Sequence, residues 1–231
     1  PHHPQRLVVR ACVRPCMRSI DSMGADQSLI GQHFAAFLFD MDGTILNSIA
    51  AAERIWANWA TANGLDPQMV LAAVHGVRAV DTIRRFAPAG TDIEAEAHRI
   101  TLAEIDDVEG IVEVPGACEF LCALPADRWA VVTSAPRTLA LRRMAAGGLP
   151  IPDVLVTAED VQRGKPAPDG FLLGAERLGV PITECLVWED SPAGGTPHTS
   201  TTAPAHATVV DYTSLSTVAT DGRLQLVDRP S

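Results

Sequence analysis

Short apolar runs alternate with amphipathic stretches over most of the chain. Four of these runs have the length of a strand and end at polar residues or turn signals: 35–39, 128–132, 154–156 and 185–188. Three neighbouring stretches carry apolar residues at helical spacing: 117–124, 138–146 and 168–178. Because strands that alternate with helices usually pair in parallel, we expect an α/β fold with a helix-covered parallel sheet.

One region breaks this alternation. Apolar residues recur only at helical spacing over four consecutive stretches: 48–63, 67–74, 79–86 and 92–108. We therefore expect residues 49–112 to form a small helical domain inserted after the first strand. Residues 34–48 and 113–231 would then form the α/β core.

Residues 1–33 show no sustained amphipathic pattern, and we expect them to form a poorly structured leader. The first twenty residues contain four arginines and no acidic residue, which is typical of a transit peptide. Sequence read in frame upstream of a natural start at Met17 or Met23 is the alternative that we favour. On either interpretation, this stretch is left out of the predicted fold.

Composition and charge exclude several classes of protein. The net charge of −10 over 231 residues argues against a general nucleic-acid surface. No segment approaches the ~20 continuous apolar residues of a membrane span, and five cysteines do not suggest a disulfide framework. We expect a monomeric, cytoplasmic protein with no nucleic-acid or membrane partner.

Polar residues stand at the ends of three predicted strands. They are Asp40 and Asp42 after the first strand, Thr133 and Ser134 after the second, and Glu189 and Asp190 after the last. Lys165, the single lysine of the chain, lies between Gly164 and Pro166. Open α/β sheets bind ligands at the carboxyl ends of their strands. Paired carboxylates, hydroxyls and one cation at such an edge suit phosphoryl transfer to an aspartate with a divalent metal ion.

Four motifs at these places, in the same order, resemble those of the haloacid dehalogenase superfamily. They are Asp40-Met41-Asp42-Gly43-Thr44, Val132-Thr133-Ser134, Gly164-Lys165-Pro166 and Glu189-Asp190-Ser191-Pro192-Ala193-Gly194. Four ordered motifs are far more specific than any one alone. The resemblance implies a Rossmann-like parallel sheet, with a small helical cap of the C1 type over the active site.

The resemblance also implies catalytic roles. Asp40 is expected to attack phosphorus and form an aspartyl-phosphate, and Asp42 to protonate the leaving alcohol and then activate water. Thr133 and the Ser134 backbone are expected to hold the phosphoryl oxygens. Lys165 is expected to offset the charge between Asp40 and the phosphate, which would otherwise repel each other.

The expected cofactor is Mg²⁺. By resemblance, its ligands are the side chain of Asp40, the backbone carbonyl of Asp42 and the carboxylate of Asp190, with Glu189 nearby. The metal ion would reduce the repulsion between a carboxylate nucleophile and a dianionic ester.

The predicted insert narrows the substrate class. Residues 49–112 contain no lysine, which excludes the phosphonate hydrolases of the superfamily, because these use a cap lysine. The sequence around His75 and Arg78 is similar to glycerol-3-phosphate and 2-deoxyglucose-6-phosphate phosphatases, so a small sugar or polyol phosphate is implied. Both residues are candidates for substrate binding; alternatively, His75 caps a helix and Arg78 is a solvated surface residue. A phosphomutase on the same scaffold remains open.

The chain departs from the family pattern after Gly194. Residues 195–204 are rich in proline and threonine, where the family continues with a helix and a further core strand. We expect an internal deletion or a sequence error there, and the missing helix would reduce stability and weaken the metal site. A catalytically impaired or non-catalytic member of the superfamily is therefore a third reading.

Overall fold

A six-stranded sheet forms the centre of the protein. The computed structural model describes residues 7–11, 29–190, 206–209 and 212–229. Four strands of the sheet are parallel, in the order β7 (Val154–Val156), β6 (Trp129–Val132), β3 (Ala36–Phe39) and β8 (Cys185–Glu189). Two further strands continue the sheet beyond β8: β1 (Leu7–Ala11) runs antiparallel to β8, and β9 (His206–Val209) runs antiparallel to β1. The predicted α/β class is confirmed, with an antiparallel edge that the sequence did not predict.

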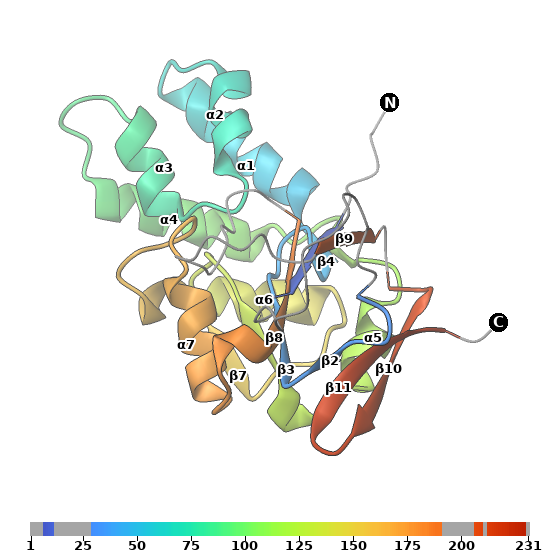
Figure 1. Ribbon diagram of the computed structural model, residues 1–231. Coiled ribbons are helices and arrows are strands. Elements are labelled where there is room, and N and C mark those ends of the chain that lie inside the picture. Colours follow the sequence, from blue (N-terminus) through green and yellow to red (C-terminus); the bar gives the residue numbers. More distant parts are fainter. Residues whose placement is uncertain (1–6, 12–28, 191–205, 210–211, 230–231) are drawn as a thin grey trace, which may run out of the picture.

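Helices cover both faces of the parallel strands (Figure 1). They are α5 (Ala117–Cys122), α6 (Arg137–Ala146) and α7 (Asp169–Arg177). Because side chains alternate along a strand, Phe37 and Phe39 of β3 pack in one apolar cluster with residues of α5 and α6. Leu38 points to the other face, where it packs in a second cluster with Phe171 of α7. Burial on both faces explains why these strands are continuously apolar.

Residues 49–106 form a separate group of helices, seen at the top of Figure 1. It consists of α1 (Ile49–Ala62), α2 (Pro67–Val74), α3 (Ala79–Phe86) and α4 (Ile93–Asp106). These helices share an apolar cluster of their own, which includes Trp56 and Trp59. Asp66 caps α2 by accepting a hydrogen bond from the Gln68 backbone. We call these four helices the helical insert.

Both connections of the helical insert to the core lie side by side. The entering segment forms β4 (Leu46–Asn47) and the returning segment forms β5 (Val112–Glu113). The two pair in antiparallel fashion, with Leu46 opposite Glu113 and Asn47 opposite Val112.

A small antiparallel sheet lies at the other end of the core (Figure 1). It is made of β2 (His33–Phe34), β11 (Arg223–Asp228) and β10 (Leu215–Thr220). Asp221 and Gly222, both with positive φ, form the two-residue turn of the β10–β11 hairpin. This is the hairpin that the Asp-Gly pair indicates.

The prediction that residues 1–33 lie outside the fold was wrong for several residues. Residues 7–11 form β1, His33 pairs in β2, and Leu29 is 1% exposed within the main apolar cluster. The physical reason is that β1 is held by backbone pairing with β8 and β9, and the five residues of the strand do not record which distant segments they pair with. The predicted deletion after Gly194 falls on residues outside the described ones.

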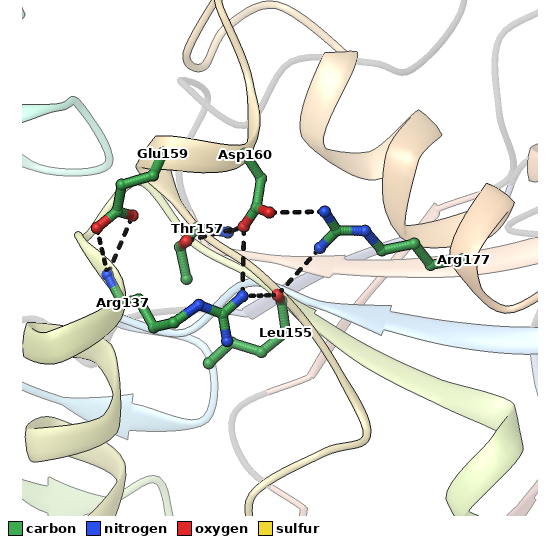
Figure 2. A network of polar contacts seen from close by, with 6 residues as sticks. All are labelled: Arg137, Leu155, Thr157, Glu159, Asp160 and Arg177. Atoms are coloured by element: carbon green, nitrogen blue, oxygen red, sulfur yellow. Dashed lines mark hydrogen bonds and ion pairs between the residues drawn. The ribbon is translucent and has the colours of Figure 1, made fainter.

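The edge strand β7 is protected by a network of polar side chains (Figure 2). The carbonyl oxygen of Leu155 accepts hydrogen bonds from Arg137 at 2.9 Å and from Arg177 at 3.4 Å. Asp160 pairs with Arg177 at 2.6 Å and closes a capping box with Thr157. Burial alone would raise the pKa of Asp160, but the hydrogen bonds from Arg177 and Thr157 lower it to about 2.

Three short 3₁₀ turns complete the description: η1 (Ala126–Arg128), η2 (Ala158–Asp160) and η3 (Ile182–Glu184). η2 carries Asp160 and begins the loop that leads to Lys165, so the network in Figure 2 fixes the start of that loop. Among the described residues, no helix combines the length and apolar character needed to cross a bilayer.

Candidate active site

The carboxyl ends of three parallel strands bring the predicted site residues together. Phe39 at the end of β3 is in register with Val131 of β6 and with Trp188 of β8. The residues that follow these strands therefore converge at one edge of the sheet. A cavity at this edge is lined by six of the predicted residues: Asp40, Asp42, His75, Thr133, Ser134 and Asp190.

Lys165 lies beside the first aspartate. Its Nζ donates hydrogen bonds to Asp40 and, at 2.7 Å, to Oε2 of Glu189, and it lies 5.0 Å from the centre of the Phe171 ring. Burial alone would lower the pKa of Lys165, but the attraction of both carboxylates holds it above its usual value. The lysine is therefore a charged, buried cation.

Three acidic side chains share the space around this lysine. One carboxylate oxygen each of Asp40, Glu189 and Asp190 lies within 4.8 Å of the others. Burial and the charge of Glu189 raise the pKa of Asp40 and bring that of Asp190 to about 7. When all three carboxylates are ionised, they outnumber the charge of the one lysine by two. Clustered carboxylates are the ligands that Mg²⁺ takes, so the cluster fits a divalent cation.

A glycine and a threonine hydroxyl hold the loop after β3 close to this cluster. Gly43 has φ of +87°, and a Cβ on it would lie 2.2 Å from Oδ2 of Asp190. The Thr44 hydroxyl lies within 3.3 Å of Asp190 and 3.4 Å of Asp40. Glycine is therefore required at position 43 for two reasons, its backbone conformation and its close approach to Asp190.

Asp42 faces a different set of partners. Its Oδ1 accepts hydrogen bonds from the Ser48 hydroxyl at 2.5 Å and from Nη1 of Arg143 at 3.0 Å. Arg143 is buried and also donates to Glu104 of α4 at 3.1 Å. The sequence reasoning missed Ser48, Arg143 and Glu104. The signal for Arg143 was present, because it stands four residues after Leu139 on the buried stripe of α6.

The second motif joins the core to the helical insert. Thr133 is buried, and its Oγ1 accepts a hydrogen bond from the Ala135 backbone at 3.1 Å. The Ser134 hydroxyl donates to the carbonyl oxygen of Gly76 at 2.9 Å. The neighbouring His75 lies in the cavity wall, with its Nε2 3.5 Å from Glu53.

Arg78 is not among the residues that line this cavity. Its Nε pairs with Asp81 at 2.7 Å, and its Nη1 donates to the carbonyl oxygen of Gln162 at 3.0 Å. The side chain crosses Gly164, where a Cβ would lie 2.6 Å from Nε. The structure thus places Arg78 between the helical insert and the loop of Lys165.

Tyr212 stabilises the loop that follows β3. This residue, the single tyrosine of the chain, is buried, and its hydroxyl donates to the carbonyl oxygen of Thr44 at 3.2 Å. Burial and the negative charges of Asp40 and Asp190 raise its pKa. It was also missed by the sequence reasoning, because 168 residues separate it from Thr44.

Comparison with known proteins identifies the family. A model of haloacid dehalogenase-like hydrolases matches residues 34–197. Hexitol phosphatase A of Escherichia coli is 48% identical over 162 residues, which are 68% of this chain and 75% of the relative. Glycerol-1-phosphate phosphohydrolase 2 of Saccharomyces cerevisiae is 36% identical over 183 residues, 74% of this chain and 73% of the relative.

Solved structures agree with these matches. The crystal structure of a hydrolase from Pseudomonas syringae superposes with a TM-score of 0.57 at 29% identity, and covers 66% of this chain and 73% of its own. The predicted enzyme class, a phosphoric monoester hydrolase, is that of the named relatives. The chain therefore belongs to the haloacid dehalogenase-like hydrolases, as its four motifs predicted.

Proposed function

We propose that this enzyme hydrolyses small sugar or polyol phosphate monoesters through an aspartyl-phosphate, with Mg²⁺ as cofactor. The observation that carries the proposal is the division between two neighbouring aspartates. Asp40 lies in the cluster of carboxylates with Lys165, whereas Asp42 lies apart, with Ser48 and Arg143. One carboxylate is thus suited to nucleophilic attack and the other to proton transfer.

In the first step, an oxygen of Asp40 attacks phosphorus and the bond from phosphorus to the ester oxygen breaks. The bonding electron pair passes to the ester oxygen, which takes a proton from Asp42 and leaves as the alcohol. Lys165 offsets the charge that accumulates on the phosphoryl oxygens. Thr133 and the Ser134 backbone, both at the cavity, orient those oxygens.

In the second step, water attacks the same phosphorus. Asp42, now ionised, takes the proton of the water, and the bond from phosphorus to Asp40 breaks. Inorganic phosphate leaves and both aspartates return to their starting protonation states, so the cycle balances.

Asp40, Asp190 and the backbone carbonyl of Asp42 would hold Mg²⁺, with Glu189 beside them. The ion, when bound, supplies positive charge that reduces the repulsion between Asp40 and the ester. The excess of carboxylates over cations in this cluster supports that assignment.

The relatives named hexitol phosphatase and glycerol-1-phosphate phosphohydrolase support a small polyol phosphate as the substrate. The helical insert contributes His75 to the cavity wall, so we propose that His75 contacts substrate hydroxyl groups. Arg78, which lies between the insert and the core, is better suited to holding the two together than to contacting the substrate.

The test is phosphate release from a panel of hexitol, hexose and glycerol phosphates, with and without Mg²⁺. Asp40→Asn should abolish release, whereas the exposed control Asp127→Asn should match wild type. Release that survives Asp40→Asn would contradict the mechanism.

Phosphorus NMR of the products separates the alternatives. Inorganic phosphate supports the phosphatase, and isomeric sugar phosphates would identify a phosphomutase. If no ester is consumed, the non-catalytic reading is correct.

A further inference from the structure

The carboxylate of Asp42 is linked to the first and the last helix of the helical insert. Its Oδ1 accepts from the hydroxyl of Ser48, the residue immediately before α1. The same oxygen accepts from Arg143, whose other Nη nitrogen donates to Glu104, close to the end of α4. The side chain expected to move the proton is thus linked to the start and to the end of the insert.

Arg143 has the charge and burial of a bridging residue. Its side chain is 7% exposed, so its guanidinium has lost most of its water, a large cost unless the charge is paired. Two carboxylates supply the pairing, Asp42 from the core loop and Glu104 from the insert, at 3.0 and 3.1 Å. Because the planar guanidinium presents fixed donors, both bonds form together only when α4 lies against α6.

We propose that Arg143 is a positioning residue that makes the placement of the Asp42 carboxylate depend on the seating of the helical insert. When the insert is seated, Glu104 holds Arg143, and Arg143 holds Asp42 facing the cavity. When the insert is displaced, Arg143 loses Glu104, so its guanidinium is held from one side only and no longer fixes the Asp42 carboxylate facing the cavity. The inference rests on the proposed function, since it assigns Asp42 the proton transfer.

The neighbouring arginine provides a matched control. Arg142, on the same helix, also reaches α4, because its Nε donates to the carbonyl oxygen of Ile105 at 3.3 Å. It is exposed, and its hydrogen bond goes to Ile105 and not to Asp42. Arg142→Met therefore removes a contact between α6 and α4 without touching the proton-transfer residue, whereas Arg143→Met removes both.

Two substrates separate positioning from a general structural role. Glycerol 1-phosphate has an alkoxide leaving group that requires a proton, whereas the nitrophenolate of p-nitrophenyl phosphate leaves without one. With Mg²⁺ present, Arg143→Met should lower kcat on glycerol 1-phosphate roughly 10- to 100-fold, a part of the ~10²–10⁴-fold that a positioned acid supplies. The first turnover of p-nitrophenyl phosphate should stay within about threefold of wild type and appear as a burst, because the second step still needs Asp42.

Glu104→Leu tests the link to the insert. It should produce the same substrate-selective loss, and it should cost little more when added to Arg143→Met, because both changes break one chain of contacts. Arg142→Met should match wild type on both substrates. Equal losses in the first turnover of the two substrates, an additive double variant, or the same selective loss in Arg142→Met would each overturn the proposal.

A structural readout keeps the inference separate from the proposed function. If wild type releases phosphate from neither ester, the proposed function fails, and a crystal structure of Arg143→Met decides the positioning. An Asp42 carboxylate displaced from its wild-type place supports the proposal. A carboxylate unmoved beside Ser48, with the insert seated as before, overturns it.

Discussion

Gly43→Ala isolates what close packing contributes to the metal site. The backbone at position 43 has φ of +87°, so an alanine there costs about 1–2 kcal/mol in the left-handed region. The new Cβ would also lie 2.2 Å from the nearest carboxylate oxygen of Asp190, and that side chain must retreat by about 1 Å to reach van der Waals contact.

A displacement of this size is decisive for a metal ligand. Mg²⁺ sites tolerate only about 0.2 Å of error in ligand distance. We therefore expect the Kd for Mg²⁺ to rise roughly 10- to 100-fold, the range found when the surroundings of metal ligands are altered. Calorimetric titration with Mg²⁺ measures this change, and urea unfolding in a chelator measures the loss of stability.

Gly31→Ala is the control. Gly31 has φ of +85°, but no atom lies within 4 Å of the Cβ position. Both variants should lose similar stability from backbone strain, and Gly43→Ala alone should lose Mg²⁺ affinity. If Gly43→Ala binds Mg²⁺ as tightly as wild type, Asp190 is not a ligand or the carboxylate tolerates the displacement, and the reasoning fails.

Three further predictions concern other parts of the protein. Asp160→Asn should lower the free energy of unfolding by about 1–2 kcal/mol at pH 7. The pKa of Asp160 in the folded protein is about 2, below the usual 3.8. In urea unfolding, the difference in stability between wild type and variant should therefore be complete above pH 4 and shrink towards pH 2. Gly164→Ala should displace Arg78 from the carbonyl oxygen of Gln162 and raise the KM for the phosphate ester roughly 2- to 10-fold, which corresponds to the loss of one hydrogen bond. An equal rise in KM when Gly164→Ala is added to Arg78→Ala would contradict this explanation. The Kd for Mg²⁺ should rise about tenfold per pH unit below 7, because binding must then displace the proton of Asp190; a Kd that is equal at pH 6 and 8 would argue against that carboxylate as a ligand.

Elements with local signals could be predicted from the sequence. The predicted stretches 67–74 and 79–86 match α2 and α3, because Asp66-Pro67 starts the first of them and Ala87-Pro88 ends the second. The convergence of Asp40, Thr133 and Asp190 was also predictable, since the carboxyl ends of parallel strands meet at one edge.

Contacts that depend on how whole elements pack could not be predicted. Arg143 and Glu104 are 39 residues apart, and their pairing requires α4 to lie on α6. The position of β1 depends on partners at residues 186–189 and 206–209. Hydrophobic periodicity reports the buried face of an element, but not which distant element covers it.

The pairing of β4 with β5 has a consequence for how such a protein can change. Because Asn47 lies opposite Val112, the chain leaves the sheet and returns to it at nearly the same point. A tight two-residue turn could bridge that gap, and so could an unrelated helical unit with closely spaced ends. The helices over the cavity can thus be exchanged as one unit while the sheet and its carboxylates stay in register, provided that the new unit keeps a partner for Arg143. Selectivity can then evolve without rebuilding the sheet edge that carries Asp40 and Asp190.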